Sequence, residues 1–290
     1  MSTSMNMMYQ AVGVSKQNFH QQMVRDNHWR EEAAYLWELM MQLREDHPMM
    51  GARTMYDKLR PQQVGRDAFI ELYNRAGMKV RRYKNYRRTT DSSGVIRFPN
   101  LTVALELTDV NQAYCSDITY YELGGEFYYL TLIMDLFSRR IVGWNASTTL
   151  RTEHTTIPCL KLLLTRIGTD DTLPIFHSDG GGQYYSKEFL QLTKGKLINS
   201  MGKTAYENPK AERLNGTIKN DYLIPYAPSD LRGLKRMLDK AVHMYNKERP
   251  HRELTKMSPI EFELQLNEKK KKDVQGKKQP NKLKLTLIDQ

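Results

Sequence analysis

The sequence predicts an α/β core, in which a mixed sheet carries helices on both faces, preceded by an all-helical region. Three observations lead to this prediction. Residues 113–147 contain three successive segments whose apolar residues alternate or run continuously, as in strands. After residue 150, segments with helical spacing alternate with short apolar runs. Residues 1–103 show helical spacing and are rich in Met, Arg, Gln and Tyr.

The N-terminal region, residues 1–103, is expected to form several short helices. In MYQAVGVSKQNFHQQMV, Gly13 acts as a turn residue and Ser15 as an N-cap, a pattern typical of a helix-turn-helix. A second helix is expected from Ala34, followed by one in RTMYDKLR and one over residues 66–75. The alternative is a small helical bundle with no role in nucleic-acid binding.

A strongly basic segment, MKVRRYKNYRRTT, follows these helices. Its cations can contact phosphates and its interleaved tyrosines can stack on bases, whereas six positive charges within ten residues repel one another unless an anion is near. We therefore expect this segment to contact nucleic acid, with a solvated basic loop as the alternative. The residues expected to bind DNA here are Arg81, Arg82, Lys84, Arg87 and Arg88.

The central region, residues 104–265, is expected to begin with three antiparallel strands in AYCSDITYY, FYYLTLIMDLF and RIVGWNASTT, joined by short turns. A helix in TEHTTIPCLKLLLTRIG, a strand in LPIFHSD, a helix in SKEFLQLTK and a strand in KLINSM follow. Helices then run from Asn208 to SPIEFELQL. This order is that of the ribonuclease H architecture, a mixed sheet with flanking helices.

The composition favours a polyanionic partner. The 44 Lys and Arg residues exceed the 33 Asp and Glu residues, and the net charge is +11. Charge alone does not separate DNA from RNA or an acidic membrane surface. Residues 266–290, with eight lysines, are expected to form a flexible basic tail that adds non-specific affinity. No apolar run is long enough to span a bilayer, and the start lacks a signal-peptide core, so the expected location is cytoplasmic. It is the bacterial nucleoid if the resemblance described below holds.

The cysteines and histidines do not suggest a zinc site. Cys115 and Cys159 are the only cysteines, and neither lies in a CxxC motif or near a histidine pair at zinc-ligand spacing. We expect both to be reduced and buried.

Three carboxylates are the strongest candidates for chemistry. Asp117 falls on the first expected strand, Asp179 follows the fourth, and Glu212 lies on a later helix, so all three are expected to converge on one edge of the sheet. Phosphodiester cleavage places negative charge on two oxygens, which two hard cations with carboxylate ligands can stabilise. We expect Asp117 to bridge two Mg²⁺ ions, with Mn²⁺ as a possible substitute, and the other two carboxylates to complete the catalytic and metal-binding set.

The helix that carries Glu212 adds further candidates. Asn208 is a favourable N-cap, and the proline after it fits the first helical position. At about 100° per residue, Glu212, Asn215 or Gly216, and Lys219 share one face. Lys219 is therefore expected to hold a DNA phosphate beside the metal ligand. Taken without the two aspartates, Glu212 and Lys219 would be ordinary surface charges.

Other polar residues near these motifs are expected to be structural. Asp135 precedes a turn, and we expect it to form an ion pair with Arg139 and Arg140 that stabilises the hairpin. His177 is expected to be a satisfied histidine at a strand end. The glycines at 180–182 allow close approach to a ligand but do not form a phosphate-binding P-loop, since no GK[ST] follows.

Several motifs together resemble the catalytic frame of insertion-sequence transposases of the two-frame IS-three family, which share their core with retroviral integrases. The matching stretches are NQAYCSDITYY, YLTLIMDLFSRRIVGW, HSDGGGQYYS, NPKAERLNGTIKNDYL and YNKERPHRELTKMSPIEF, and the likeness extends from about residue 104 to 265. It implies that Asp117, Asp179 and Glu212 bind metal, that Lys219 contacts DNA, and that Asn215 lines the site. It also implies a packing or DNA-facing C-terminal signature in Tyr245, Asn246, Arg249, His251, Leu254 and Pro259.

The chain departs from the family pattern at three places. Tyr114 stands where the family usually has tryptophan, and Gly180 replaces a usual arginine. Glu212 follows Asp179 by 33 positions, fewer than usual, so the loop over residues 202–207 is expected to be short.

The resemblance implies a DNA transposase that cleaves a strand at each element end and transfers the 3′-OH to a second phosphodiester. Its expected partners are the terminal inverted repeats, target DNA, further copies of itself on DNA, and an upstream-frame product joined as a partner or as a frameshift fusion. Two alternatives remain: a decayed or adopted DNA-binding protein that represses transposition, and a ribonuclease H-like nuclease without strand transfer.

Overall fold

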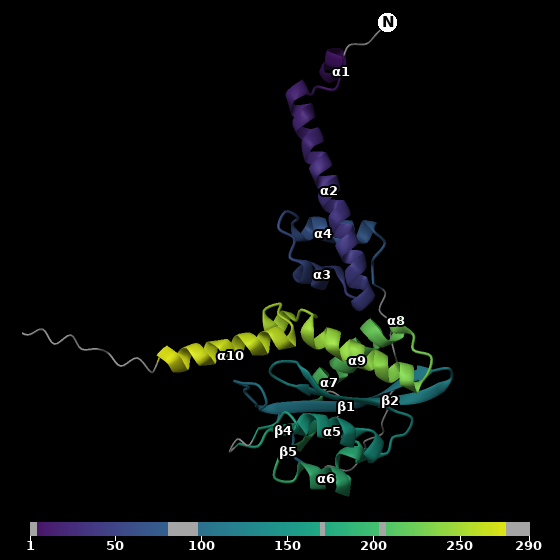
Figure 1. Ribbon diagram of the computed structural model, residues 1–290, viewed down its shortest axis with the longest axis vertical. Helices are drawn as coiled ribbons and strands as arrows, with labels where there is room; N and C mark the ends of the chain where they lie inside the picture. The colour runs from purple at the N-terminus through teal and green to yellow at the C-terminus, as the bar shows by residue number, and fades with distance from the viewer. Residues whose placement is uncertain (1–4, 81–97, 169–171, 203–206, 277–290) are drawn as a thin grey trace, which may run out of the picture. The chain divides into compact units, whose positions relative to one another are not determined.

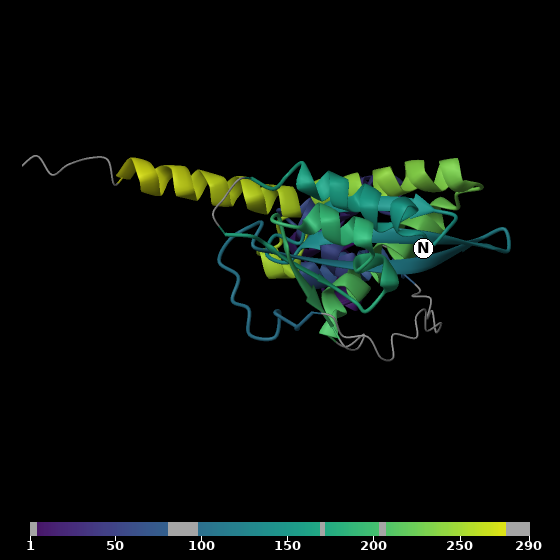
Figure 2. The ribbon, with the colours of Figure 1, turned by 90° about the horizontal axis from the view of Figure 1, so that it is seen from below.

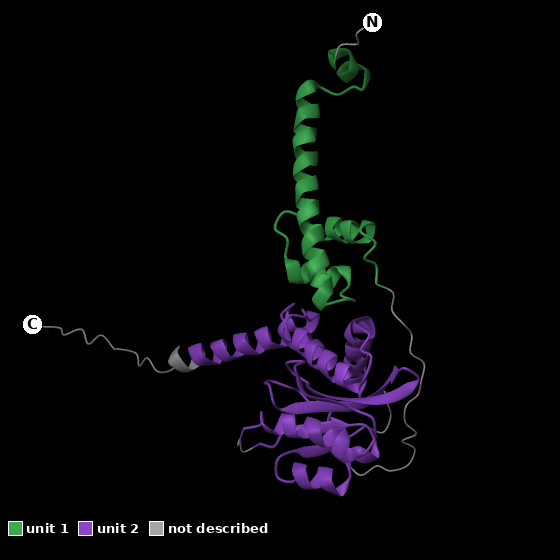
Figure 3. Ribbon diagram, turned by 45° about the vertical axis from the view of Figure 1, so that its right-hand side comes forward, with its two compact units in different colours: residues 1–81 green, residues 82–290 purple. Residues whose placement is uncertain are grey.

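The computed structural model describes residues 5–80, 98–168, 172–202 and 207–276 (Figure 1). The chain divides into two compact units, residues 1–81 and 82–290, which Figure 3 distinguishes by colour. Within the described ranges, no helix combines the length and the apolar character needed to cross a lipid bilayer.

The first unit is helical, as the sequence predicts. It contains α1 (Met5–Ala11), α2 (Lys16–Asp46), α3 (Ala52–Leu59) and α4 (Arg66–Arg75). Gly13 adopts a left-handed conformation in the turn before α2, and the Ser15 hydroxyl caps this helix by accepting a hydrogen bond from the Asn18 amide. The separate helix expected from Ala34 is wrong, because α2 runs unbroken through it. No glycine or proline occurs in α2 to end it earlier.

The core of the first unit joins α2, α3 and α4. Its buried side chains are Leu36, Met40, Met50, Met55, Val64, Phe69, Tyr73 and Met78. Helix α1 contributes no buried residue, and its Tyr9 ring contacts Phe19 of α2. The turn between α1 and α2 therefore exists, but the packed part of this unit is a bundle of the later helices.

The second unit is built on a five-stranded mixed sheet of order β3-β2-β1-β4-β5. Strands β1 (Ala113–Leu123), β2 (Glu126–Asp135) and β3 (Ile141–Ser147) are antiparallel neighbours, as predicted. Strands β4 (Ile175–Ser178) and β5 (Ile198–Met201) continue the sheet parallel to β1. This arrangement, with its flanking helices, is ribonuclease H-like.

Helices cover both faces of the sheet (Figure 1). On one face lie α7 (Pro209–Thr217) and α9 (Leu231–Lys247), together with the π-helix η4 (Ile218–Leu223) and the short α8 (Ile224–Tyr226). On the other lie α5 (Thr156–Leu164) and α6 (Lys187–Thr193). Helix α5 packs so closely on β3 that a Cβ on Gly143 would lie 2.5 Å from the Cys159 carbonyl oxygen.

The C-terminal helix α10 (Pro259–Gly276) begins beside the core and then leaves it, as two views at right angles show (Figure 1; Figure 2). We expected a flexible segment from residue 266, but the helix continues ten residues further, to Gly276. The run from 266 to 275 contains no glycine or proline, so nothing in it breaks the helix.

Strand β1 is much longer than its neighbour β4. Residues 113–115 of β1 pair with β4, so Ser116–Leu123 has no described strand beside it on that side. The backbone groups on this free edge need other hydrogen-bond partners. The free edge of β1 is where the candidate site lies.

Candidate active site

Asp117 lies at the start of the free edge of β1 and is half-buried. One of its carboxylate oxygens accepts a hydrogen bond of 2.9 Å from the Asn215 side-chain amide of α7. Burial raises the pKa of Asp117 to about 7, and the negative charge of Asp179 adds to this increase. The Ile118 backbone amide and Asn215 oppose the shift, and Glu212 contributes a smaller increase.

Asp179 follows the end of β4, beside β1. Its carboxylate accepts a 3.1 Å hydrogen bond from the Gly181 backbone amide, and a Cβ on Gly181 would lie 3.0 Å from the same oxygen. Burial raises the pKa of Asp179, while the Gly181 amide opposes the shift. The close approach of Gly181 therefore explains one glycine of the triplet that follows this aspartate.

Glu212 lies on the exposed side of α7, in its first turn. Partial burial raises its pKa. Asn215, three residues after Glu212 on α7, bonds to Asp117, and β4, which Asp179 follows, pairs with β1. The fold therefore brings together the strand, the strand end and the helix that carry the three carboxylates. The separation of these residues along the chain spans almost one hundred positions, from 117 to 212.

The three carboxylates offer the oxygen ligands that Mg²⁺ and Mn²⁺ prefer. No described lysine or arginine forms an ion pair with any of them, although the charges of Asp117 and Lys219 attract each other. The donor set thus fits a divalent cation. Among the described residues, however, no three or more His, Cys, Asp and Glu side chains are already placed closely enough to hold a metal ion together.

Lys219 lies on η4 and points to the free edge of β1. Its ammonium group donates hydrogen bonds of 3.0 Å to the Thr119 hydroxyl and to the Tyr120 carbonyl. Burial lowers the pKa of Lys219, and the charge of Asp117 opposes this shift. The α-helix ends at Thr217 and Lys219 lies in the π-helix that continues it, so the turn from Glu212 to Lys219 is not wholly α-helical. Asn215 and Lys219 both bond to β1, as side chains on one face would.

Asn208 also binds the free edge of β1. Its side-chain amide donates a 2.9 Å hydrogen bond to the Ser116 carbonyl, and its side chain forms no cap on α7. The sequence places Asn208 correctly before the first helical position, but the predicted capping role is wrong. A backbone carbonyl without a strand partner uses the side chain instead.

Tyr184 is a neighbour of the site that the sequence did not identify. It is buried between Phe176 and Phe189, and its hydroxyl lies 2.8 Å from the Ser116 hydroxyl. Burial raises its pKa, and the charges of Asp179 and Asp117 add to the shift, which places this phenol beside both aspartates. The pattern GGQYY gave no sign of this contact.

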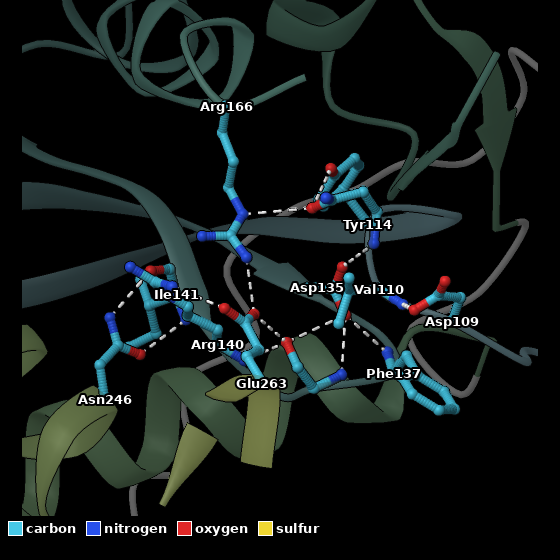
Figure 4. Close-up of polar contacts among 12 residues, drawn as sticks. Asp109, Val110, Tyr114, Asp135, Phe137, Arg140, Ile141, Arg166, Asn246 and Glu263 are labelled. Atoms are coloured by element: carbon cyan, nitrogen blue, oxygen red, sulfur yellow. Dashed lines mark hydrogen bonds and ion pairs between the residues drawn. The ribbon is translucent and has the colours of Figure 1, made fainter. Parts of the chain in front are cut away.

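Asp135 is structural, as predicted, but by a different interaction. It accepts hydrogen bonds from the backbone amides of Asn111, Phe137 and Ser138 (Figure 4). The predicted ion pair with Arg139 and Arg140 is wrong, since those side chains pair with Glu253 and Glu263. A buried carboxylate that accepts several amide hydrogens caps the turn without a cation.

Glu263 of α10 is the centre of a second polar cluster (Figure 4). Its carboxylate accepts hydrogen bonds from Arg140, Arg166 and the Ser138 hydroxyl at 2.6 to 2.8 Å. Arg166 also donates to the Asn111 side chain, which accepts the Tyr114 hydroxyl. Tyr114 is thus linked through Asn111 and Arg166 to Glu263 of α10.

The remaining residues named in the sequence analysis either have structural roles or lie outside the described residues. His177 is buried between the Ser200 hydroxyl and the Glu207 carbonyl, in agreement with a structural role. Cys115 and Cys159 are free and buried, as predicted. In the C-terminal signature, Asn246 binds both backbone groups of Ile141, which is a packing role (Figure 4). Arg81, Arg82, Lys84, Arg87 and Arg88 lie outside the described residues.

Comparison with known families agrees with this geometry. A family model described as Integrase core domain matches residues 108–199, and a second model with the same description matches residues 194–259. Together they span more than half of the chain. The chain belongs to the integrase core family. The integrase core includes all three carboxylates and every strand of the sheet.

Curated relatives of this integrase core are proteins of bacterial insertion sequences. A putative transposase of element IS150 from Escherichia coli K12 is 25% identical over 66% of this chain and 67% of its own length. The transposase of element IS629 from Shigella sonnei is 29% identical over 60% of each chain. With a mycobacterial relative from element IS986/IS6110, the match covers 58% of the relative. The matches thus span about three fifths to two thirds of these relatives.

Among solved structures, the catalytic core domain of HTLV-2 integrase in complex with magnesium is 20% identical, with a TM-score of 0.43. The match covers 53% of this chain and 96% of that domain.

Proposed function

We propose that this integrase core is a DNA transposase that cleaves a donor strand at element ends and joins the resulting 3′-OH to a second phosphodiester. The observation that carries the proposal is the position of Asp117 at the free edge of β1, where Asn215 of α7, three residues after Glu212, bonds its carboxylate and β4, which Asp179 follows, pairs beside it. Burial and the neighbouring acids also raise the pKa of Asp117. Carboxylates that disfavour one another's ionised form, with no ion-pairing cation from the described chain, are suited to binding a metal. The insertion-sequence relatives supply the reaction class.

Each residue of the site has a proposed role. Asp117 supplies a ligand from β1 and Asp179 from just after β4, and Glu212 completes the set from α7. Two divalent cations, Mg²⁺ or Mn²⁺, would stabilise charge on the attacking and leaving oxygens of an in-line displacement when bound. Asn215 holds the Asp117 carboxylate in place through its 2.9 Å hydrogen bond. Lys219 donates two of its three ammonium N–H groups to oxygen atoms of β1, which leaves the third N–H for a DNA phosphate.

The proposed partners follow from charge and reaction. The net charge of +11 suits DNA, and the basic segment with Arg81, Arg82, Lys84, Arg87 and Arg88 is proposed as a DNA contact. Joining two element ends requires more than one end in a complex, so we propose an oligomer on DNA. An upstream-frame partner, or a fusion with it, remains part of the proposal, as does a place at the nucleoid.

The test is a strand-transfer assay with Mg²⁺ on labelled duplexes that carry the inverted repeats flanking the gene. Wild-type protein should nick the end and join it to target DNA. Asp117→Asn, Asp179→Asn and Glu212→Gln should each lower both steps by at least a hundredfold, while Glu188→Gln, an exposed acid on α6, should leave them unchanged.

The outcomes separate the candidate functions. Binding without nicking by wild-type protein would support a repressor instead, and nicking without joining would support a nuclease. Full cleavage by Glu212→Gln would remove Glu212 from the catalytic set.

A further inference from the structure

The N-terminal half of α2 is an exposed helix with exposed apolar side chains. Every residue from Lys16 to Glu31 is exposed, over a length of about 24 Å. Phe19, Met23 and Trp37 along this helix are 38%, 46% and 47% exposed. Long helices without a packed face are marginal in water, and exposed apolar side chains in such numbers mark an interaction surface.

Five exposed side chains of this helix, together with the half-buried Ala33, follow a heptad pattern. Phe19, Met23, Asp26, Arg30, Ala33 and Trp37 are spaced by four, three, four, three and four residues. This spacing places them on one stripe of the helix, as the a and d positions of a coiled coil require. We call these six residues the α2 seam. His28, whose ring nitrogen lies 2.6 Å from the Gln63 side chain, is on the opposite side of the helix, so that contact leaves the seam open.

The α2 seam is complementary to itself in the antiparallel direction. If two copies of α2 cross at residue 28, Phe19 meets Trp37 of the other copy and Met23 meets Ala33. Asp26 then meets Arg30, so the only charged layers join opposite charges. In a parallel pair, Asp26 would meet Asp26 and Arg30 would meet Arg30, which is repulsive. The exposed flanking positions include no acid, lysine or arginine: His20, Gln22, Asn27, Trp29 and Ala34. The last flanking position, Leu36, is buried in the core of the first unit.

We propose that the α2 seam binds the α2 seam of a second copy of this chain as an antiparallel pair. The charge complementarity of Asp26 and Arg30 selects a second copy as the occupant and sets its direction. This surface lies in the first unit, outside the candidate active site. The proposal is therefore independent of the reaction proposed for the core.

The first experiment measures self-association of the full chain by sedimentation velocity, without DNA or metal. Asp26→Arg and Arg30→Asp should each weaken the dimer by roughly tenfold or more, because each places two like-charged layers in it. The double variant should restore the wild-type constant, since exchanging both charges regenerates the opposite pairs only in the antiparallel arrangement. Glu31→Arg, an exposed charge reversal off the seam, should leave the constant unchanged.

The second experiment tests the register by disulfide formation. Met23→Cys mixed with Ala33→Cys should yield a covalent mixed dimer on mild oxidation, whereas neither variant alone should. Wild-type protein gives the background of the two buried native cysteines.

The results decide the proposal without reference to catalysis. A monomeric wild type, a dimer indifferent to Asp26→Arg, or a double variant as weak as the single ones would each overturn it. Covalent dimers of Met23→Cys alone would indicate a parallel pair and would also overturn it. Asp117→Asn should dimerise like wild type, so a failure of the proposed reaction leaves these measurements unaffected.

Discussion

At the scale of single residues, Asp117 shows how burial and like charges prepare a carboxylate for a cation. Burial and the neighbouring acids raise its pKa, so the folded chain holds this proton more tightly than an exposed aspartate does, although the hydrogen bond from Asn215 favours the ionised form. The raised pKa shows that burial and the neighbouring acids outweigh the hydrogen bonds to Asp117. A ligand that adds positive charge would reverse that balance.

This balance predicts a pH-dependent stability. The folded state holds the Asp117 proton more tightly than the unfolded chain, so this residue favours folding below about pH 4, and that contribution is lost as the pH rises to about 7. In metal-free protein at pH 8, Asp117→Asn should therefore raise the free energy of unfolding by about 2 kcal/mol. Near pH 4 the two proteins should differ little.

Urea unfolding in EDTA at pH 4, 6 and 8 measures this effect. Glu122→Gln, an exposed acid on the same strand, serves as the control. A difference between Asp117→Asn and wild type that does not change with pH would contradict the proposed environment of Asp117.

Glu263 shows the opposite effect of the surroundings. Burial alone would raise the pKa of Glu263, but the hydrogen bonds and charges of Arg166 and Arg140, with the Ser138 hydroxyl, outweigh it and lower the pKa. Glu263→Gln leaves two arginines without their partner. Since these arginine side chains are only 22% and 31% exposed, the variant should lose about 2 kcal/mol of unfolding free energy at pH 7.

The Glu263 effect should depend on pH with the opposite sign to that of Asp117. A lowered carboxyl pKa stabilises the fold above the ordinary value, and this stability is lost as the pH falls through the folded pKa, below about 4.5. Thermal unfolding from pH 7 to pH 3 would show wild type and variant converging. Glu268→Gln, an exposed acid on the same helix, should have no such effect; equal stability of Glu263→Gln and wild type at pH 7 would contradict the cluster.

At the scale of elements, the free edge of β1 organises the site. β4 is too short to cover this edge, and Asn208, just before α7, and Lys219 of η4 bind the carbonyls of Ser116 and Tyr120 in its place. These contacts fix the helix that carries Glu212 against the strand that carries Asp117. The π-helix η4 turns Lys219 toward β1, and such wide turns inside helices are often found at functional sites.

If Lys219 stabilises the fold, its replacement should lower the stability of the protein even when no DNA is bound. Lys219→Met removes hydrogen bonds to Thr119 and Tyr120 and should lower the free energy of unfolding by about 1 kcal/mol. Arg213→Met, an exposed cation on α7, is the matched control. Urea unfolding in the absence of DNA measures both; unchanged stability of Lys219→Met would restrict Lys219 to a DNA contact.

At the scale of the whole molecule, the net charge of +11 sets the expected response to salt. Residues 277–290 contain four lysines. If all four contact phosphates, replacing them by glutamine should reduce the slope of log affinity against log salt by about 3.6. Fluorescence anisotropy with a DNA duplex over a series of KCl concentrations measures the slope.

The matched control for the salt experiment is the replacement of Lys187, Lys194 and Lys196, which are exposed on and beside α6. Those changes should alter the slope less, since they remove charge away from the proposed DNA contacts. A slope that is unchanged on loss of the four C-terminal lysines would show that they do not bind phosphate.

The sequence by itself determined the element order, because apolar periodicity is a local property of strands and helices. It therefore predicted the meander around Gly124-Gly125, the ribonuclease H-like order and the family motifs that carry Asp117, Asp179 and Glu212. It also placed the turn at Gly13 and the cap at Ser15, since these depend on neighbouring residues alone.

Tertiary structure decided which partner each polar group finds. The amides that bind Asp135, the acids that bind Arg139 and Arg140, and the carbonyl that binds Asn208 depend on where distant segments meet. The hydrogen bonds of Lys219 to β1 join remote segments in the same way. Local sequence patterns do not predict contacts between remote segments, because a hydrogen bond between two such segments forms only when both are packed.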